Sequence, residues 1–465
     1  MGRDPNRQHS KLTGLWTRLN DGSLRTQIMR NMGVSLVVRV FSMGGGLLMQ
    51  LVLARLLGLT EFGLYTYAWA SMLTLLIIGK MGFEFSSIRF VADYHTQQEW
   101  GLLRGFMLQA RRLVLGMTVL AALGAAIALQ ALLRTGRLEP ETVQVFGAAL
   151  VVMPILGIAE VQSGILRGAD RLSIALFTQN AMLPLGIALL APLLLLIDGA
   201  RTAVGALVIS AVVALITVSL QFAMIRRVIP RAAGRVAPVF QTRAWLKVSG
   251  AMMLSTGVEQ LMRQLDVIVV GTLIGAAATG VYAVAARFAR LINIGLQISN
   301  QSTAHMYTPL YRQGRQAELQ KVVSFTALVT MLTTIPLVLL LFFFPGPILT
   351  LFGESFSQQG TVALQILLVG QSANAIAGPN GVLMYMTRYQ NEMIFILVTT
   401  LLLDLLLMLL LIPHLGLAGV AVAVSVAAVF RNAATVWRVR RHLGIDTTIF
   451  APTVWRQLAS RASKQ

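Results

Sequence analysis

Residues 249–301 read SGAMMLSTGVEQLMRQLDVIVVGTLIGAAATGVYAVAARFARLINIGLQISNQ, two long apolar segments joined by a short Gly/Ala turn. Inside these segments lie five charged residues: Glu259, Arg263, Asp266, Arg287 and Arg290. An ionised side chain at the centre of a bilayer costs roughly 2.5–3.5 kcal/mol, whereas a Leu or Ile favours insertion by only about 0.3–0.6 kcal/mol. We therefore expect these charges to line a wet cavity or to pair with one another, rather than to face lipid.

The composition of the chain is that of a membrane protein. Of its 465 residues, 56% are hydrophobic and only 12% are charged, against about 25% charged in a soluble domain. We expect an all-α polytopic membrane protein. The chain has no cysteine, which excludes disulfides, thiol nucleophiles and Cys-bound metals.

Segments of about 20 mostly apolar residues, the length that crosses a bilayer, can be placed twelve times. Nothing between them resembles a soluble catalytic domain. The predicted segments are 31–57, 62–82, 111–134, 142–166, 172–197, 202–225, 248–272, 278–304, 322–345, 360–387, 391–413 and 416–437.

Positive charge predicts the orientation of these segments. Of the 38 Lys and Arg residues, only Arg134, Arg137 and Arg201 fall in the loops of one side, and most of the others fall in the loops and chain ends of the other side. Because basic loops stay in the cytoplasm, both termini are expected there. The same bias explains the net charge of +20 without a nucleic-acid partner.

The chain contains an internal duplication. Residues 56–68 (LLGLTEFGLYTYA) and 273–285 (LIGAAATGVYAVA) share a G-x-x-x-x-G-x-Y core, and residues 164–171 (GILRGADR) align with 381–388 (GVLMYMTR). Both pairs are separated by 217 positions (273 − 56 and 381 − 164). An even number of helices in each half gives the halves the same direction across the membrane. We expect two six-helix lobes related by a pseudo-two-fold axis along the membrane normal, with a substrate site between them.

The predicted boundaries follow from this duplication. We expect a cytoplasmic segment at 1–30, an N-lobe at 31–227, a cytoplasmic linker at 228–247, a C-lobe at 248–442 and a cytoplasmic tail at 443–465.

Polar residues share one face of the first predicted helix. Ser35, Arg39, Ser42, Gly46 and Gln50 recur at spacings of three and four residues. A packing face of small residues would explain Ser and Gly but not an arginine. We expect Arg39 and Gln50 to line the cavity.

The seventh helix carries charges of both signs. Glu259 and Arg263 are four residues apart and Arg263 and Asp266 three, so one arginine could be neutralised within its own helix. A buried ion triad with no role in transport is the structural alternative. If the acids are functional, Asp266 and Glu259 are the candidates for coupling to H⁺ or Na⁺.

The eighth helix carries Arg287, Arg290 and Gln297 and no acid after Arg287. Two arginines one turn apart suit an anionic ligand, because the guanidinium binds phosphate in a bidentate manner. The alternative is that they pair with Asp266 or Glu259 of the neighbouring helix.

Enzymatic functions have little support. The chain has no G-x-x-x-x-G-K-[ST] sequence for ATP and no H-E-x-x-H zinc site. No cofactor is expected apart from a coupling ion.

Residues 54–76 (ARLLGLTEFGLYTYAWASMLTLL) and 82–94 (GFEFSSIRFVADY) resemble the start of the polysaccharide-biosynthesis flippase family. This is the Wzx-type branch of the superfamily that includes the MATE drug exporters and the lipid II flippase. The resemblance implies two lobes around a cationic cavity lined by helices 1, 2, 7 and 8. It also implies export of a polyprenyl-pyrophosphate-linked oligosaccharide, or a related glycan, across the bacterial inner membrane by alternating access. Membrane lipids and glycan polymerase or assembly proteins are the implied partners.

Three other functions compete with this one. A MATE-type exporter of drugs or cations would be expected to have an acidic pocket. A membrane-embedded glycan polymerase or ligase would need a sizeable external loop, and the loops here are short. A non-transporting scaffold of a glycan assembly complex has no need for charges within the membrane.

Overall fold

The computed structural model describes residues 22–452, with the side chains of 22–40, 42, 231, 232 and 255 left undescribed. Within this range the chain is helical and contains no strand. The helices of the N-half are α2 (Gly22–Lys80), α3 (Phe83–Gln97), α4 (Trp100–Arg134), α5 (Pro140–Gly168), α6 (Leu172–Leu176), η1 (Phe177–Met182), α7 (Leu183–Leu190), η2 (Ala191–Leu195) and α8 (Ala203–Val228). After α9 (Arg231–Arg235), the C-half consists of α10 (Thr242–Leu273), α11 (Ala276–Leu291), α12 (Ile294–Arg312), α13 (Gln316–Phe343), α14 (Pro345–Thr350), α15 (Glu354–Ala377), α16 (Asn380–Met386) and α17 (Gln390–Leu443).

The helices are long and apolar enough for a multi-pass membrane protein. Eight of the described helices could cross a membrane, or nine if α11 and α12, bent by 44°, form one span. Non-helical backbone at Gly58 divides α2 into two helices, and Gly416 divides α17 in the same way. With α10, which is 32 residues long but carries five charged residues, this arrangement is consistent with the predicted twelve helices in two lobes.

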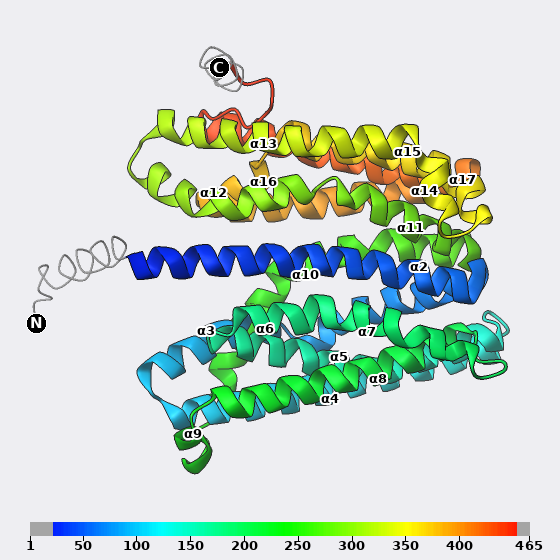
Figure 1. The fold of residues 1–465 in the computed structure, drawn as a ribbon, viewed down its shortest axis with the longest axis horizontal. Helices are drawn as coiled ribbons and strands as arrows, with labels where there is room; N and C mark the ends of the chain where they lie inside the picture. Colours follow the sequence, from blue (N-terminus) through cyan, green and yellow to red (C-terminus); the bar gives the residue numbers. More distant parts are fainter. Residues whose placement is uncertain (1–21, 453–465) are drawn as a thin grey trace, which may run out of the picture.

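Figure 1 shows these helices in two groups. The C-half helices α11–α17 lie above and the N-half helices α3–α8 below, with the first part of α2 running between them. Helix α10 starts close to the N-half: Ser86 of α3 and Ser249 of α10 have their hydroxyl oxygens 2.6 Å apart. It ends in the C-half, so α10 joins the two groups.

Glycines with positive φ mark the same turns in both halves. Gly58, Gly136 and Gly199 have φ of 78°, 68° and 75°. Their counterparts 217 positions later are Gly275, Gly353 and Gly416, with φ of 122°, 143° and 53°. Residues other than glycine rarely adopt this backbone. The duplication seen in the sequence is therefore present in the backbone. We call the side of the molecule that carries these turns the turn face.

The opposite side carries α3, α9 and the ends of α8 and α17, and we call it the basic face (Figure 1, left). Arginines in the last turns of both helices give it its charge: Arg226, Arg227, Arg440 and Arg441.

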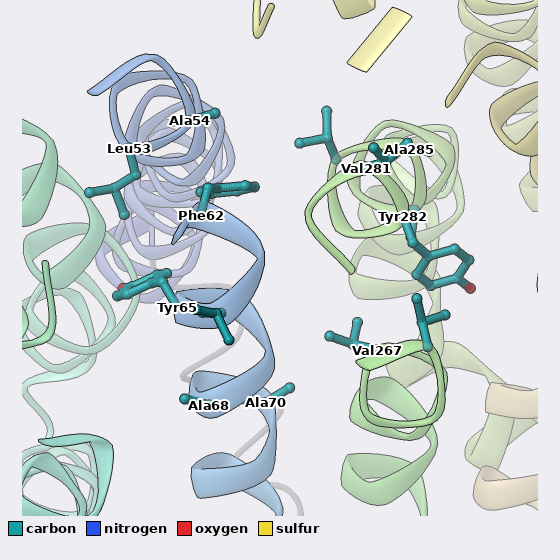
Figure 2. Packing of buried hydrophobic residues seen from close by; sticks show 14 of the residues in the cluster. Leu53, Ala54, Phe62, Tyr65, Ala68, Ala70, Val267, Val281, Tyr282 and Ala285 are labelled. Carbon is teal, nitrogen blue, oxygen red and sulfur yellow. The ribbon is translucent and has the colours of Figure 1, made fainter. Parts of the chain in front are cut away.

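The largest buried cluster holds the halves together near the turn face. Figure 2 shows Phe62 and Tyr65 of α2 on one side and Val281 and Tyr282 of α11 on the other, all nearly fully buried. Tyr65 and Tyr282 are the equivalent tyrosines of the repeated G-x-x-x-x-G-x-Y core. Within a bilayer, exclusion of water does not drive apolar helices together, so these helices are held by the close packing of their side chains.

Candidate functional site

A polar cavity of about 450 Å³ lies within the C-half. Its walls come from α10, α11, α12, α15, α16 and α17. Five of the residues singled out from the sequence line it: Glu259, Arg263, Asp266, Arg290 and Gln297.

Asp266 is the best-satisfied acid in this cavity. Tyr282 donates a hydrogen bond of 2.9 Å to its Oδ2, and the backbone N–H of Val267 lies 2.9 Å from its Oδ1. The Arg290 guanidinium lies 3.8 Å from Oδ2. Arg290 therefore pairs with an acid of the neighbouring helix, which is the alternative to binding an anionic ligand. Because Asp266 is buried with these partners, it also has a structural role.

Glu259 is not paired with Arg263, although the two are one helical turn apart. Its Oε1 accepts a hydrogen bond of 2.7 Å from Tyr385 of α16. In the part of the chain that is described, Arg263 has no ion pair within 4 Å, and it lines both this cavity and a second one in the N-half. Its position is the boundary between the two halves.

Amide side chains form a network across the cavity wall. Asn374 of α15 donates to Asn293 (3.1 Å) and to Gln371 (2.8 Å), and its own Oδ1 accepts from Arg431 (2.9 Å) and Asn432 (2.7 Å) of α17. The network continues as Asn380 donates to Asn432 at 3.1 Å. Amide groups both donate and accept, which suits hydroxyl-rich ligands.

Two more charged residues complete this wall, Asp404 and Arg431 of α17. Asp404 is 6% exposed, and its Oδ1 is buried without a hydrogen-bond partner among the described residues. Arg263, Arg290 and Arg431 thus share the cavity with Glu259, Asp266 and Asp404.

The second cavity, of about 260 Å³, lies at the basic-face end of the N-half and reaches α10. Lys80 at the end of α2 is its central residue, with Nζ 3.1 Å from Glu84 and 3.8 Å from Glu160. The same Nζ donates to Gln260 of α10 at 3.3 Å, and Gln179 donates to Glu160 at 2.9 Å. This cluster neutralises Lys80 and links the halves.

The two cavities occupy equivalent positions in the two halves. Five lining residues of the N-half cavity have counterparts, 217 positions later, that line the C-half cavity. Lys80 corresponds to Gln297, so a charged cluster in one half matches an amide wall in the other. The remaining equivalent pairs are Leu73 and Arg290, Leu76 and Asn293, Ser163 and Asn380, and Gly164 and Gly381.

Two other residues chosen from the sequence, Arg287 and Gln50, line neither cavity. Arg287 lies against α2, where a Cβ on Gly46 would collide with its guanidinium, and no ion pair of Arg287 is found in the described part of the chain. Gln50 has a buried Oε1 with no hydrogen-bond partner among the residues described. The side chain of Arg39 is outside the described residues.

Sequence reasoning missed the amide network and the Lys80 cluster. Residues 371–381 (QSANAIAGPNG) did carry a signal, since amides surround a Gly-Pro break between two helices. As for metals, the residues searched contain no group of three His, Cys, Asp or Glu that could hold an ion.

Comparison with protein families decides the affiliation of the chain. Residues 28–305 match the family described as polysaccharide biosynthesis protein. The chain belongs to the polysaccharide biosynthesis protein family. Residues 251–410 also match the MatE family. No match was found among curated proteins.

Solved structures with the same fold are transporters and flippases. An inward-facing MATE family multidrug transporter of the MOP superfamily aligns with a TM-score of 0.74 and 16% identity, over 88% of this chain and 98% of that chain. The lipid II flippase MurJ in an inward closed conformation gives 0.67 and 17%, over 87% of each chain. A MOP superfamily transporter from Pyrococcus furiosus, whose reverse binding-pocket polarity suggests a different function, gives 0.62 and 14%, over 89% and 95%. The chain is therefore a multi-pass membrane protein with the fold of MOP-superfamily transporters, not of an enzyme.

Proposed function

We propose that this protein is a flippase for a polyprenyl-pyrophosphate-linked oligosaccharide or a related glycan. The cargo would move across the bacterial inner membrane by alternating access of two lobes, 31–227 and 248–442, joined by the linker 228–247. Both termini, including the segments 1–30 and 443–465, would lie in the cytoplasm, which makes the basic face the cytoplasmic one. Glycan polymerase or assembly proteins are the proposed partners.

The observation that carries this proposal is the pair of arginines at the boundary of the halves. Neither Arg263 nor Arg287 has an ion pair among the described residues. An uncompensated guanidinium within a membrane is costly, and it persists where a ligand or water meets it. A pyrophosphate is a suitable counter-charge because guanidinium groups bind phosphate oxygens in a bidentate manner. Arg39, Arg290, Gln50 and Gln297 belong to the same proposed binding surface.

The amide network suits the glycan part of such a cargo. Asn293, Gln371 and Asn374 present donors and acceptors at the wall of a 450 Å³ cavity next to Arg263. A neutral sugar bound there would leave its phosphate close to the boundary arginines. The lipid tail would stay in the bilayer, since neither the 450 Å³ cavity nor the 260 Å³ cavity has room for a polyprenyl chain.

Movement between the two access states requires contacts at opposite ends to break in turn. On the basic face these are Ser86 with Ser249 and Lys80 with Gln260. On the turn face Tyr67 and Thr272 have their hydroxyl oxygens 2.8 Å apart. We propose that cargo release on one side accompanies breakage of one set while the other forms.

Coupling to H⁺ or Na⁺ is assigned to Asp266 and Glu259. Both acids line the C-half cavity and are hydrogen-bonded to tyrosines, Tyr282 and Tyr385. Protonation or cation binding would weaken their hold on Arg290 and the tyrosines. Neutral replacement of both acids should then remove the ion dependence of transport, and unchanged dependence would exclude them.

One observation favours a second function, MATE-type export of an organic cation. The C-half cavity holds Glu259, Asp266 and Asp404 as well as three arginines, so it has acids for a cation. Residues 251–410, which contain most of this wall, match the MatE family.

Leaflet translocation separates the two functions. A fluorescent polyprenyl-pyrophosphate oligosaccharide is reconstituted with the protein in liposomes, and its exposure to an external quencher is followed. We expect the native protein to move it and Arg263→Gln and Arg287→Gln to lose the activity, while Arg112→Gln, an exposed arginine of α4, retains it. Export of organic cations without movement of the lipid would establish the second function instead.

A further inference from the structure

Two arginines of the N-half lie around one aromatic ring. Helices α4 and α8 both pack on α5. The Arg111 guanidinium of α4 lies 5.3 Å from the ring centroid of Phe222 on α8, and that of Arg226 lies 4.4 Å from it. The ring thus orients two cations beside each other.

The described residues supply no acceptor for these cations. The Nε and Nη2 atoms of Arg111 are buried and have no hydrogen-bond partner among the described residues. Neither Arg111 nor Arg226 forms an ion pair in that part of the chain, and Arg226 is exposed. A buried donor without an acceptor is destabilising, and two adjacent positive charges repel. An anion from outside the chain that reaches the exposed Arg226 would compensate the charge of both arginines.

The depth of the site is that of phospholipid headgroups. Helix α8 ends at Val228, close to Arg226, on the basic face. Arg111 lies about 16 Å from the start of α4 at a rise of 1.5 Å per residue. The part of α4 from Arg111 to Arg134 is long enough to cross the ~30 Å hydrocarbon core. Both arginines are thus placed at the boundary between hydrocarbon and headgroups.

An apolar track leads from the arginines toward the bilayer centre. On α4, Leu115 and Val119 follow Arg111 at one and two turns and are 47% and 38% exposed. On α8, Phe222 and Leu215 are 37% and 51% exposed. An acyl chain attached to a phosphate between the arginines would lie along these side chains, whereas a free phosphate would make no contact with them.

We propose that Arg111 and Arg226 bind the phosphate of an anionic phospholipid on the basic face. Phe222 holds the two guanidinium groups in position, and the acyl chain lies along Leu115 and Leu215. Basic pockets between transmembrane helices bind anionic headgroups in this way. The site is separate from the C-half cavity and does not depend on the cargo proposed for it.

The test compares two double variants of equal charge. Arg111→Gln/Arg226→Gln removes the proposed ligands. Arg112→Gln/Arg227→Gln removes two exposed arginines one position further along the same helices, which leaves charge and depth matched. Purified, delipidated protein is titrated with phosphatidylglycerol, phosphatidylcholine or inorganic phosphate, and binding is read by native mass spectrometry and by the midpoint of thermal unfolding.

We expect phosphatidylglycerol to bind the native protein and the Arg112/Arg227 variant alike. Binding to the Arg111/Arg226 variant should weaken on the order of tenfold or more, because a charged hydrogen bond is lost at each position. Equal binding by both double variants, or equal binding of phosphatidylcholine, would overturn the site. Inorganic phosphate binding as tightly as the lipid would overturn the assignment of its occupant. Unchanged thermal midpoints in detergent alone show that both variants are folded.

Discussion

Gly63 of α2 and Gly280 of α11 pack backbone against backbone, although they are 217 positions apart in the chain. A Cβ on Gly280 would lie 3.3 Å from the Cα of Gly63, and a Cβ on Gly63 would collide with the carbonyl oxygen of Ala276. Because the two glycines are equivalent in the repeat, their contact lies next to the pseudo-two-fold axis. The backbones of the two halves are therefore in direct contact at this point, near the turn face.

A methyl group at Gly63 should separate the halves. Gly63→Ala is expected to lower the free energy of unfolding by about 1–3 kcal/mol, the usual cost of overpacking. The matched control is Gly116→Ala in α4, where a Cβ has nothing within 4 Å and alanine favours the helix. Thermal unfolding in detergent compares them, and equal midpoints would mean that the glycine contact is not a constraint on packing.

Lys80 should stabilise the fold by balancing the negative charges of Glu84 and Glu160. Its side chain and that of Glu84 are 7% and 8% exposed. Lys80→Met leaves the buried Glu84 without its cation, which typically costs about 3–5 kcal/mol, and also removes a partner of the partly exposed Glu160. Neutralising the acid as well, in Lys80→Met/Glu84→Gln, should recover part of the stability. A double variant no more stable than Lys80→Met alone would contradict the pairing.

Arg287 and Arg290 should respond differently to the same substitution. Arg290→Gln removes the cation beside the buried Asp266, so we expect a lower thermal midpoint. Arg287 has no acidic partner in the described part of the chain, so Arg287→Gln should keep or raise the midpoint while weakening binding of a polyprenyl pyrophosphate. Equal loss of stability in both variants would assign Arg287 a structural role.

Acid should release the segment that follows α17. Burial alone would raise the pKa of Asp446, but hydrogen bonds from the backbone and hydroxyl of Thr448 and from Arg440 outweigh it and hold the pKa below the ordinary 3.8. A carboxylate with a lowered pKa stabilises the folded state above its unfolded pKa, and this stabilisation is lost as pH falls through the folded value. Docking of residues 444–452 should therefore be full above about pH 4 and weaken below it.

Hydrogen exchange of residues 444–452 between pH 3 and 6, corrected for the intrinsic exchange rate, checks this expectation. Asp446→Asn should abolish the pH dependence and lower protection at neutral pH. Native protein whose protection does not change over this range would show that Asp446 does not hold the segment.

The repeat and the membrane class could be predicted from sequence because both depend on spacing along the chain. The positive-φ glycines at 58 and 275 confirm the predicted offset of 217. The spacing of the charged residues also indicated that Arg263, Asp266 and Arg290 face a common cavity. They line one in the structure, because α10 and α11 are regular helices at these positions.

The features that could not be predicted from the sequence are the positions of helix breaks and the directions of long side chains. The predicted helix 278–304 is divided between α11 and α12 with a bend of 44°, which turns Asn293 toward Gln371. Arg287 and Arg290 are three residues apart and share a helical face, yet one reaches α2 and the other Asp266. Periodicity fixes the face of a helix but not the partner that a long side chain selects.

The most direct test of the account combines translocation with a reversible lock. The native chain has no cysteine, and Ser86 and Ser249 have their hydroxyl oxygens 2.6 Å apart across the halves. Ser86→Cys/Ser249→Cys should form a disulfide that holds α10 against α3. In proteoliposomes with a fluorescent polyprenyl-pyrophosphate oligosaccharide, we expect oxidation to stop translocation and reduction to restore it, with each single-cysteine variant unaffected. Translocation that continues in the oxidised protein would contradict alternating access of the two halves, and absence of lipid movement in the native protein would contradict the flippase itself.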